Sequence, residues 1–346
     1  MGDTLTAVSP GDARAQKQVE ALLEQEGIRK DGHLDYTCGL FDEDWRLMAT
    51  GSCFGNTLRC LAVDRTRRGE GLLNQVVSHL IEVQAQRGNT HLFLYTKPQS
   101  AKFFGDLGFY EIARVDGSLV FMENRRQGFD RYCAALEESR REGRSAAIVM
   151  NANPFTLGHL CLAERASAEN DAVHLFVLSE EAGPIPFAVR RRLVREGTAH
   201  LANVICHDSG PYIISGATFP SYFLRDEDAV IRAHAALDLA VFGKIAPRLG
   251  VTRRYVGEER ASHVTALYNQ EMAARLPGLG VECRVVPRLE REGAPVSAST
   301  VRQAIHDGRL EDIRPLVPDS TWSYFSAPEA APVIAAIQKT QDVIHY

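Results

Sequence analysis

The chain has 346 residues, of which 45% are hydrophobic and 24% are charged. This length and composition predict two globular domains and exclude a disordered chain. The 39 basic and 44 acidic side chains give a net charge of −5, which argues against a nucleic-acid binder that relies on a broad basic surface. No apolar run reaches the roughly 18 residues of a membrane span, and the polar first residues lack a secretion signal. We therefore expect a cytoplasmic protein without a membrane or nucleic-acid partner.

The cysteines do not suggest a metal site or a disulfide framework. None of them forms a C-x-x-C pair, and no Cys/His cluster has the spacing of zinc ligands. We therefore expect small core residues in a reducing compartment and no protein-bound metal. The seven are Cys38, Cys53, Cys60, Cys133, Cys161, Cys206 and Cys283.

The first part of the chain predicts an α/β domain over residues 1–130. Short apolar strands are expected over 58–63, over 91–96 and from Phe109 onward, with a glycine-punctuated turn over 67–71 and a helix after it. A charged helical stretch over 125–143 follows. We place the boundary within it, so that residues 131–143 form a connecting helix and residues 144–346 the second domain.

The second part alternates strands and helices, which is typical of a parallel sheet with right-handed crossovers. Such sheets bind ligands beyond the carboxyl ends of their strands. Functional residues are therefore expected just after positions 150, 178, 207, 257 and 286. The predicted strands cover 145–150, 172–178, 203–207, 253–257 and 282–286.

The sharpest motif is NANPFTLGHL, which directly follows the strand 145–150. Thr156, Gly158 and His159 stand where a helix begins, and a helix N-terminus offers free backbone N–H groups and a partial positive charge. Gly158 would let a phosphate approach the backbone, and Thr156 and His159 would donate to the same anion. The alternative is a capped helix with an incidental histidine.

A second motif, VSASTVR over 296–302, follows the last strand. Ser297 and Ser299 suit a helix cap, and Arg302 would lie one turn into the helix on the phosphate side. Capping alone also explains the two serines. Because the two motifs follow the first and last strands of one sheet, they support each other as parts of a single anion site.

Together these motifs resemble the nucleotidylyltransferase superfamily, which usually has H-x-G-H where this chain has Thr156 in place of the first histidine. The likeness narrows to the citrate lyase ligase family. It extends over NANPFTLGH, the segment 212–226, YVGEE at 255–259, TALYNQEM at 265–272 and VSASTVRQAI at 296–305. The resemblance implies a Rossmann-like second domain that binds ATP with magnesium. It also implies an acid–thiol ligase that acetylates the prosthetic-group thiol on the acyl carrier (gamma) subunit of citrate lyase, releasing AMP and pyrophosphate.

The same resemblance assigns the site residues. The carboxylate of acetate would attack the α-phosphorus without a protein nucleophile, so catalysis would rest on orientation and charge stabilisation. His159, Thr156 and Arg302 are the expected catalytic residues. Arg190 is also expected at the phosphate, with a solvated helix face as its alternative. The expected ATP-binding residues are Asn151, Asn153, Pro154, Phe155, Gly158, Arg190, Gly257, Glu258, Ser297, Ser299 and Thr300.

The turn Arg68-Gly69-Glu70-Gly71 resembles the CoA-pyrophosphate loop of GNAT acetyltransferases, which implies a GNAT-like first domain. Arg68, Gly69 and Gly71 are candidates to bind the CoA-derived prosthetic group, against the alternative of a vestigial domain. The segment 212–226 is a candidate for acetate or carrier contact, against a packed loop. Six histidines are expected to be structural or solvent-facing: His33, His79, His91, His174, His234 and His306.

Three other functions remain open from the sequence. One is an adenylyltransferase acting on another small acceptor, which would incorporate AMP into its product. Another is an acetyl-CoA-dependent N-acetyltransferase whose second domain has degenerated. The last is a nucleotide-sensing scaffold for citrate lyase, which would not turn over ATP.

Overall fold

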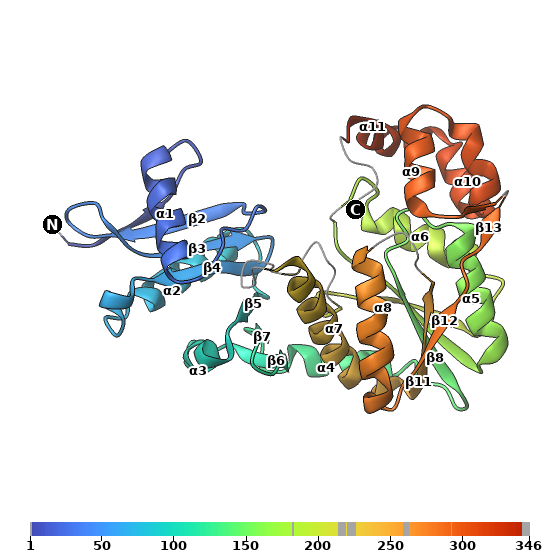
Figure 1. Cartoon of the computed structure of the whole chain (residues 1–346), viewed down its shortest axis with the longest axis horizontal. Coiled ribbons are helices and arrows are strands. Elements are labelled where there is room, and N and C mark those ends of the chain that lie inside the picture. The colour runs from blue at the N-terminus through green and yellow to red at the C-terminus, as the bar shows by residue number, and fades with distance from the viewer. Residues whose placement is uncertain are drawn as a thin grey trace. The chain divides into compact units, whose positions relative to one another are not determined.

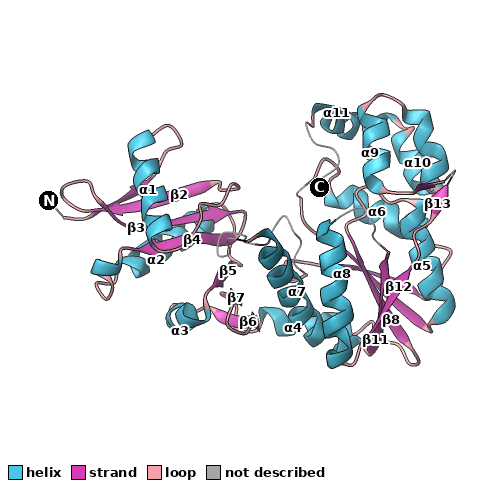
Figure 2. Ribbon diagram, in the orientation of Figure 1, coloured by secondary structure: helices cyan, strands magenta, loops and turns pink. Residues whose placement is uncertain are grey.

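The computed structural model describes residues 2–181, 183–213, 219, 226–258, 263–291 and 293–340. The chain divides into two compact units, one of residues 1–131 with 220–233 and one of 132–219 with 234–346. Each unit contains a sheet and flanking helices (Figures 1 and 2), so the predicted α/β class is confirmed. No helix in the described ranges is both long and apolar enough to cross a membrane.

The first unit is built on a seven-stranded sheet in the order β1-β2-β3-β4-β5-β7-β6. All of its neighbouring strands are antiparallel except the pair β4 and β5. Strands β1, β2, β3 and β7 were not among the sequence predictions. The elements are β1 (Thr4–Ala7), α1 (Ala13–Gln25), β2 (Tyr36–Phe41), β3 (Leu47–Phe54), β4 (Thr57–Val63), α2 (Leu72–Gln86), β5 (Phe93–Thr96), α3 (Ala101–Asp106), β6 (Tyr110–Val115) and β7 (Leu119–Glu123).

Two helices cover the faces of this sheet. Helix α1 packs Val19 and Leu22 against Phe41, whereas α2 packs with a separate cluster that contains Leu40. Because successive side chains of a strand point to opposite faces, neighbouring residues of β2 reach the two clusters. Strands β4 and β5 pair at only two positions near their starts, and beyond them a cleft lies between the strands.

The second unit is built on a five-stranded parallel sheet in the order β10-β9-β8-β11-β12, which confirms the predicted parallel sheet. Helices α4 and α7 each begin in residues of the first unit and continue into the second. The elements are α4 (Gly128–Glu137), β8 (Ser145–Met150), α5 (Leu157–Glu169), β9 (Ala172–Val177), α6 (Phe187–Gly197), β10 (Val204–Asp208), α7 (Glu227–Leu249), β11 (Val251–Gly257), α8 (His263–Arg275), β12 (Glu282–Val286), β13 (Glu290–Arg291), β14 (Ala294–Pro295), α9 (Ala298–His306), α10 (Asp319–Phe325) and α11 (Ala331–Lys339).

The order of these strands reverses at β8. The chain runs from β8 through β9 to β10 on one side, and then returns to β11 and β12 on the other. In an open parallel sheet, ligands bind outside the carboxyl ends of the strands at such a reversal. Figure 1 shows α5 on one side of β8 and β11, with α8 and α7 on the other.

The connection between the units differs from the expected helix over 131–143. Helix α4 covers Gly128–Glu137 and ends there because the backbone N–H and the hydroxyl of Ser139 both donate to the carbonyl of Leu136. Gly143 then adopts a φ of +91°, a left-handed conformation that favours glycine. The charged residues after Glu137 therefore form turns that lead into β8.

Candidate functional site

A cavity of about 450 Å³ lies in the second unit, over the carboxyl ends of its central strands. Its lining includes residues at or next to the ends of β8, β9, β11 and β12, as predicted for positions 150, 178, 257 and 286. The starts of α5 and α9 and residues of α7 and α8 also line the cavity. The position after β10, near residue 207, does not contribute to this lining.

The start of α5 is organised by a reciprocal cap between Thr156 and His159. The Thr156 hydroxyl accepts the His159 backbone N–H at 3.4 Å, and His159 Nδ1 accepts the Thr156 backbone N–H at 3.1 Å. Because Nδ1 is an acceptor, the neutral imidazole carries its proton on Nε2. Burial, with Arg288 nearby, lowers the pKa of His159 to about 4. His159 is therefore a neutral donor at physiological pH.

Gly158 has a packing role that the sequence did not reveal. A Cβ added at Gly158 would meet the main-chain oxygen of Val296 at 3.1 Å, which is tighter than most real contacts. The glycine therefore lets the segment before α9 lie directly against the start of α5. The two predicted motifs, which begin at residues 151 and 296, meet at one cavity, and both Gly158 and Val296 line it.

The start of α9 is capped by Ser297. Its hydroxyl accepts the backbone N–H of Thr300 at 3.0 Å and lies 2.8 Å from the hydroxyl of Ser299. Ser297 and Ala298 line the cavity. Two helix N-termini thus converge there, and each brings backbone N–H groups and a partial positive charge that suit an anion such as a polyphosphate.

The structure brings seven of the predicted residues to the cavity wall and leaves the others outside it. Those in the lining are Asn151, Thr156, Gly158, His159, Gly257, Glu258 and Ser297. Those outside the lining are Asn153, Pro154, Phe155, Arg190, Ser299, Thr300 and Arg302. Direct ATP contact by the second group stays a prediction: Asn153, Arg190 and Arg302 are buried, whereas Thr300 is exposed.

Arg190 illustrates this second group. Its side chain is 2% exposed and donates to the main-chain oxygens of Asn151, Leu178, Glu180 and Ile185. It also donates to the Asn151 side chain at 2.8 Å. Burial lowers the pKa of Arg190. In this arrangement the guanidinium fixes the loops that follow β8 and β9.

Arg302 has a similar position behind the other motif. It is 3% exposed, and its Nη1 donates to the Asn153 carbonyl at 2.6 Å. The helix α9 is thereby tied to the loop 151–156, which includes a cis bond between Asn153 and Pro154. The catalytic role predicted for Arg302 is not tested by these contacts.

Several polar residues of the wall were not predicted as site residues, among them His234, Asp238, Arg254 and Tyr268. His234 was expected to be structural or solvent-facing, but it lines the cavity and stacks edge-on with Tyr268 at 5.4 Å. A signal was present, because Asp238 interrupts the apolar helical run AALDLAVF and Arg254 lies inside a buried strand. A charge in such a position is buried and must have a partner or a function.

The first unit has a cavity of about 740 Å³ at the cleft between β4 and β5. Arg68, Gly69 and Gly71 line it, and the two glycines have φ values of +92° and +76°. Arg68 pairs with Glu26, which is also in the lining. Prosthetic-group binding by this turn remains a prediction. Most of the candidate segment 212–226 lies outside the described residues, although Ile213 lines the cavity of the second unit.

Comparison with known proteins identifies the family. Residues 145–325 match the citrate lyase ligase C-terminal domain. A [citrate [pro-3S]-lyase] ligase of Klebsiella pneumoniae is 40% identical over 319 residues, covering 90% of this chain and 93% of the relative. A protein of the same name from Escherichia coli K12 is 36% identical, covering 93% of each chain. The chain belongs to the citrate lyase ligase family. The predicted enzyme class, a ligase, is thereby confirmed.

Two solved acyltransferase structures show a limited likeness to about a third of this chain. An acyl-CoA N-acyltransferase from Pseudomonas aeruginosa is 14% identical, with a TM-score of 0.31, covering 36% of this chain and all of that one. A GNAT-family acetyltransferase from Staphylococcus aureus is 12% identical, with a TM-score of 0.30 and the same coverage.

Proposed function

We propose that this member of the citrate lyase ligase family activates acetate with ATP and transfers the acetyl group to the prosthetic-group thiol of the citrate lyase acyl carrier subunit. In the first step an acetate oxygen bonds to the α-phosphorus, and the bond to pyrophosphate breaks, which leaves acetyl-adenylate. In the second step the thiol sulfur bonds to the acetyl carbon, and the bond to AMP breaks. The thiol proton leaves to solvent or to the phosphate group of the released AMP.

One observation carries the proposal: two helix N-termini, those of α5 and α9, meet at one cavity at the switch point of a parallel sheet. This geometry fits a triphosphate because backbone N–H groups from both helices face the same space. Magnesium would enter bound to ATP and shield charge between its phosphates. Within the described residues, no group of three or more His, Cys, Asp or Glu side chains is arranged to hold a metal.

His159 is the side chain best placed to act on the phosphates. Its neutral state and the Nδ1 contact leave the Nε2 proton as the group it can donate. A fixed neutral donor can stabilise charge that develops on a phosphate oxygen without losing its own proton. Thr156 positions this donor through the reciprocal cap. The adenosine part would lie toward Gly257 and Glu258, which line the same cavity after β11.

The first unit is proposed to bind the arm of the prosthetic group. That arm is derived from CoA and therefore carries a pyrophosphate and an amide-containing chain. The glycine turn from Arg68 to Gly71 offers backbone N–H groups for the pyrophosphate, and the cleft beside it offers room for the chain.

The test of the adenylation step is acetate-dependent exchange of labelled pyrophosphate into ATP by the full chain. We expect exchange with acetate and none without it. Release of free AMP on adding the thiol form of the carrier separates this ligase from an adenylyltransferase, which would retain AMP in its product. Absence of acetate-dependent exchange in a folded, ATP-binding protein would overturn the proposal.

The test of the arm-binding role compares two substitutions of one glycine. Gly71→Glu places a negative charge in the turn, whereas Gly71→Ala imposes the same unfavourable φ without the charge. We expect Gly71→Glu to retain pyrophosphate exchange but to lose carrier acetylation, and Gly71→Ala to retain most of both. Equal acetylation by the two variants would show that the arm binds elsewhere.

A further inference from the structure

Arg254 occupies an unusual position in the wall of the 450 Å³ cavity of the second unit. It lies in the middle of β11, is 3% exposed and lines the cavity. Its chain neighbours Arg253 and Tyr255 point to the other face of the sheet, where they contact the end of α5. Alternation along the strand therefore sends one arginine of the pair to each face.

The donors of Arg254 are only partly used. Nη2 lies 3.3 Å from Asp238 Oδ2, and the guanidinium stacks over the ring of Phe242 at 4.5 Å. Its Nε and Nη1 are buried without a hydrogen-bond partner within the described part of the chain, and so is Asp238 Oδ1. A buried guanidinium with unmet donors is costly, so such a group calls for a ligand or an ordered water.

The charges around Arg254 indicate what kind of ligand fits. Asp238 is 1% exposed and faces the guanidinium, so the pair has almost no net charge and would disfavour a multiply charged triphosphate. A singly charged carboxylate suits the remaining donors. The cavity wall also includes apolar side chains that suit a methyl group: Leu178, Ile213, Val256, Val264 and Met272.

We propose that Arg254 binds the carboxylate of acetate in this cavity, an assignment that rests on the proposed function. One carboxylate oxygen accepts from the guanidinium, and the other is left to attack the α-phosphorus of an ATP held by the starts of α5 and α9. The methyl group lies against the apolar wall. The charge-assisted hydrogen bond contributes more to the binding free energy of acetate than the contact of its methyl group does.

Asp238 and Tyr268 are positioning residues in this arrangement. The Tyr268 hydroxyl donates to Asp238 Oδ2 at 2.5 Å, and the same oxygen faces Arg254. Burial and the adjacent carboxylate raise the pKa of Tyr268 well above its ordinary value, so the hydroxyl remains a donor. Tyr268→Phe removes this restraint and leaves the guanidinium in place. We expect a rise of severalfold in the KM for acetate, with the kcat of exchange nearly unchanged.

The decisive test compares Arg254→Gln with Arg253→Gln in the pyrophosphate exchange of the full chain. Arg253 is the matched control, because it is the adjacent arginine and pairs with Glu282 on the opposite face. Arg254→Gln should raise the KM for acetate roughly 10–100-fold and leave the KM for ATP within about twofold. Arg253→Gln should change neither constant.

The outcomes separate the two proposals. If the unaltered protein shows no acetate-dependent exchange, the proposed function itself fails. If it does, and folded Arg254→Gln keeps its KM for acetate or loses ATP affinity instead, the acetate assignment is overturned. Should Arg254→Gln not fold, a crystal structure of the unaltered chain with acetate and a non-hydrolysable ATP analogue decides. Acetate on the guanidinium supports the assignment, and acetate elsewhere with only water at Arg254 refutes it.

Discussion

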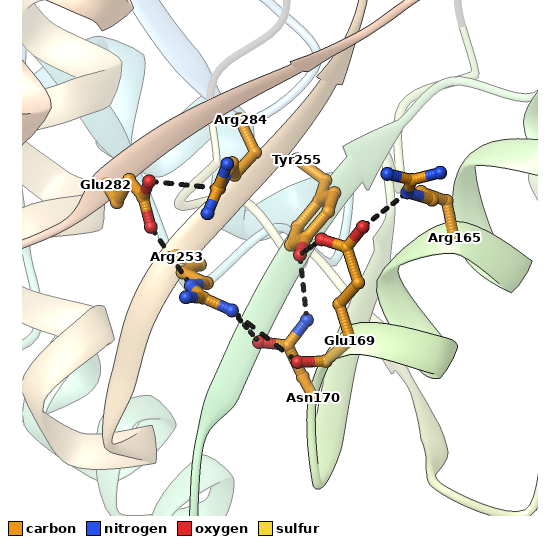
Figure 3. A network of polar contacts seen from close by, with 7 residues as sticks. All are labelled: Arg165, Glu169, Asn170, Arg253, Tyr255, Glu282 and Arg284. Carbon is orange, nitrogen blue, oxygen red and sulfur yellow. Dashed lines mark hydrogen bonds and ion pairs between the residues drawn. The ribbon is translucent and has the colours of Figure 1, made fainter.

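The two faces of strand β11 carry polar clusters that differ in how completely their members are paired. On the face toward α5, the Tyr255 hydroxyl donates to Glu169 at 2.6 Å and accepts from Asn170 at 3.0 Å. Arg253 donates to Glu282 at 3.0 Å and reaches Asn170 Oδ1 at 3.5 Å. Figure 3 shows this network as a continuous chain of contacts. Its members satisfy one another without any ligand.

On the opposite face, Arg254, Asp238 and Tyr268 form a smaller and more deeply buried cluster. Tyr268 has one hydrogen bond to Asp238, but two nitrogens of Arg254 and one oxygen of Asp238 are left unmatched by described residues. Stability alone would favour closing such a gap with another side chain or an apolar residue. The comparison indicates that one cluster holds the sheet together, while the other is arranged for something that enters the cavity.

The largest expected effect is on stability, from Asp238→Ala. This change leaves Arg254 buried without its carboxylate partner, which typically costs about 3–5 kcal/mol in the free energy of unfolding. Glu169→Ala, on the partly exposed face, should cost no more than about 1 kcal/mol. Urea denaturation of the two variants and the unaltered chain measures the difference. Similar losses would mean that the clusters do not differ in the way described.

The next largest effect is on catalysis, from His159→Ala. Removing one donor aimed at developing charge typically lowers the rate on the order of 10²–10³-fold. Pyrophosphate exchange should fall by that factor, while circular dichroism stays unchanged. His200→Ala, at an exposed histidine that pairs with Glu164, is the control and should retain full exchange. Near-normal exchange in folded His159→Ala would remove the histidine from the mechanism.

A third prediction concerns stability at low pH, because the sheet of the second unit also contains a buried histidine pair. His174 of β9 and His207 of β10 lie 2.9 Å apart, and burial lowers both pKa values from 6.5 to about 4. The unfolded chain therefore binds protons that the native state does not. The contribution of this pair to the free energy of unfolding is fully present above about pH 6.5 and is lost as the pH falls toward 4.

From pH 7 to pH 5 the loss should reach roughly 4 kcal/mol for the pair, about 2 kcal/mol for each histidine. Measuring the free energy of unfolding at about pH 7 and about pH 5 tests it. His174→Gln should reduce the difference between the two values, whereas the exposed His200→Gln should not. An unchanged pH dependence in His174→Gln would show that the pair is not the acid-sensitive group.

The smallest expected effect comes from Tyr255→Phe on the fully paired face. Loss of the hydroxyl removes the contacts to Glu169 and Asn170, but Asn170 keeps its bond to the Ala166 carbonyl at 2.8 Å. The expected cost is about 1 kcal/mol in the free energy of unfolding, with no change in exchange kinetics. Any rise in the KM for acetate would show that contacts on this face of β11 also affect acetate binding in the cavity.

Much of the fold could be predicted from local patterns. The five strands of the second unit were placed within about two residues because each is a short buried run between turn residues. Strands β1, β2, β3 and β7 were missed because they pair through long-range contacts and carry mixed sequences such as LMATGSCF. The connecting helix was overextended because a Ser139 hydrogen bond, not composition, ends α4.

For the candidate site, the sequence by itself determined the two helix-start motifs, the order of strands that brings them to one edge, and the family. Spacing along one chain segment is enough for such features, because a cap and its donors lie within one turn. Only the tertiary structure decided which residues line the cavity. It placed Arg190 and Arg302 behind the wall and assembled Arg254, Asp238 and Tyr268 from β11, α7 and α8. Partners so far apart in sequence are chosen by packing and by the pairing of buried charge, which no local pattern records.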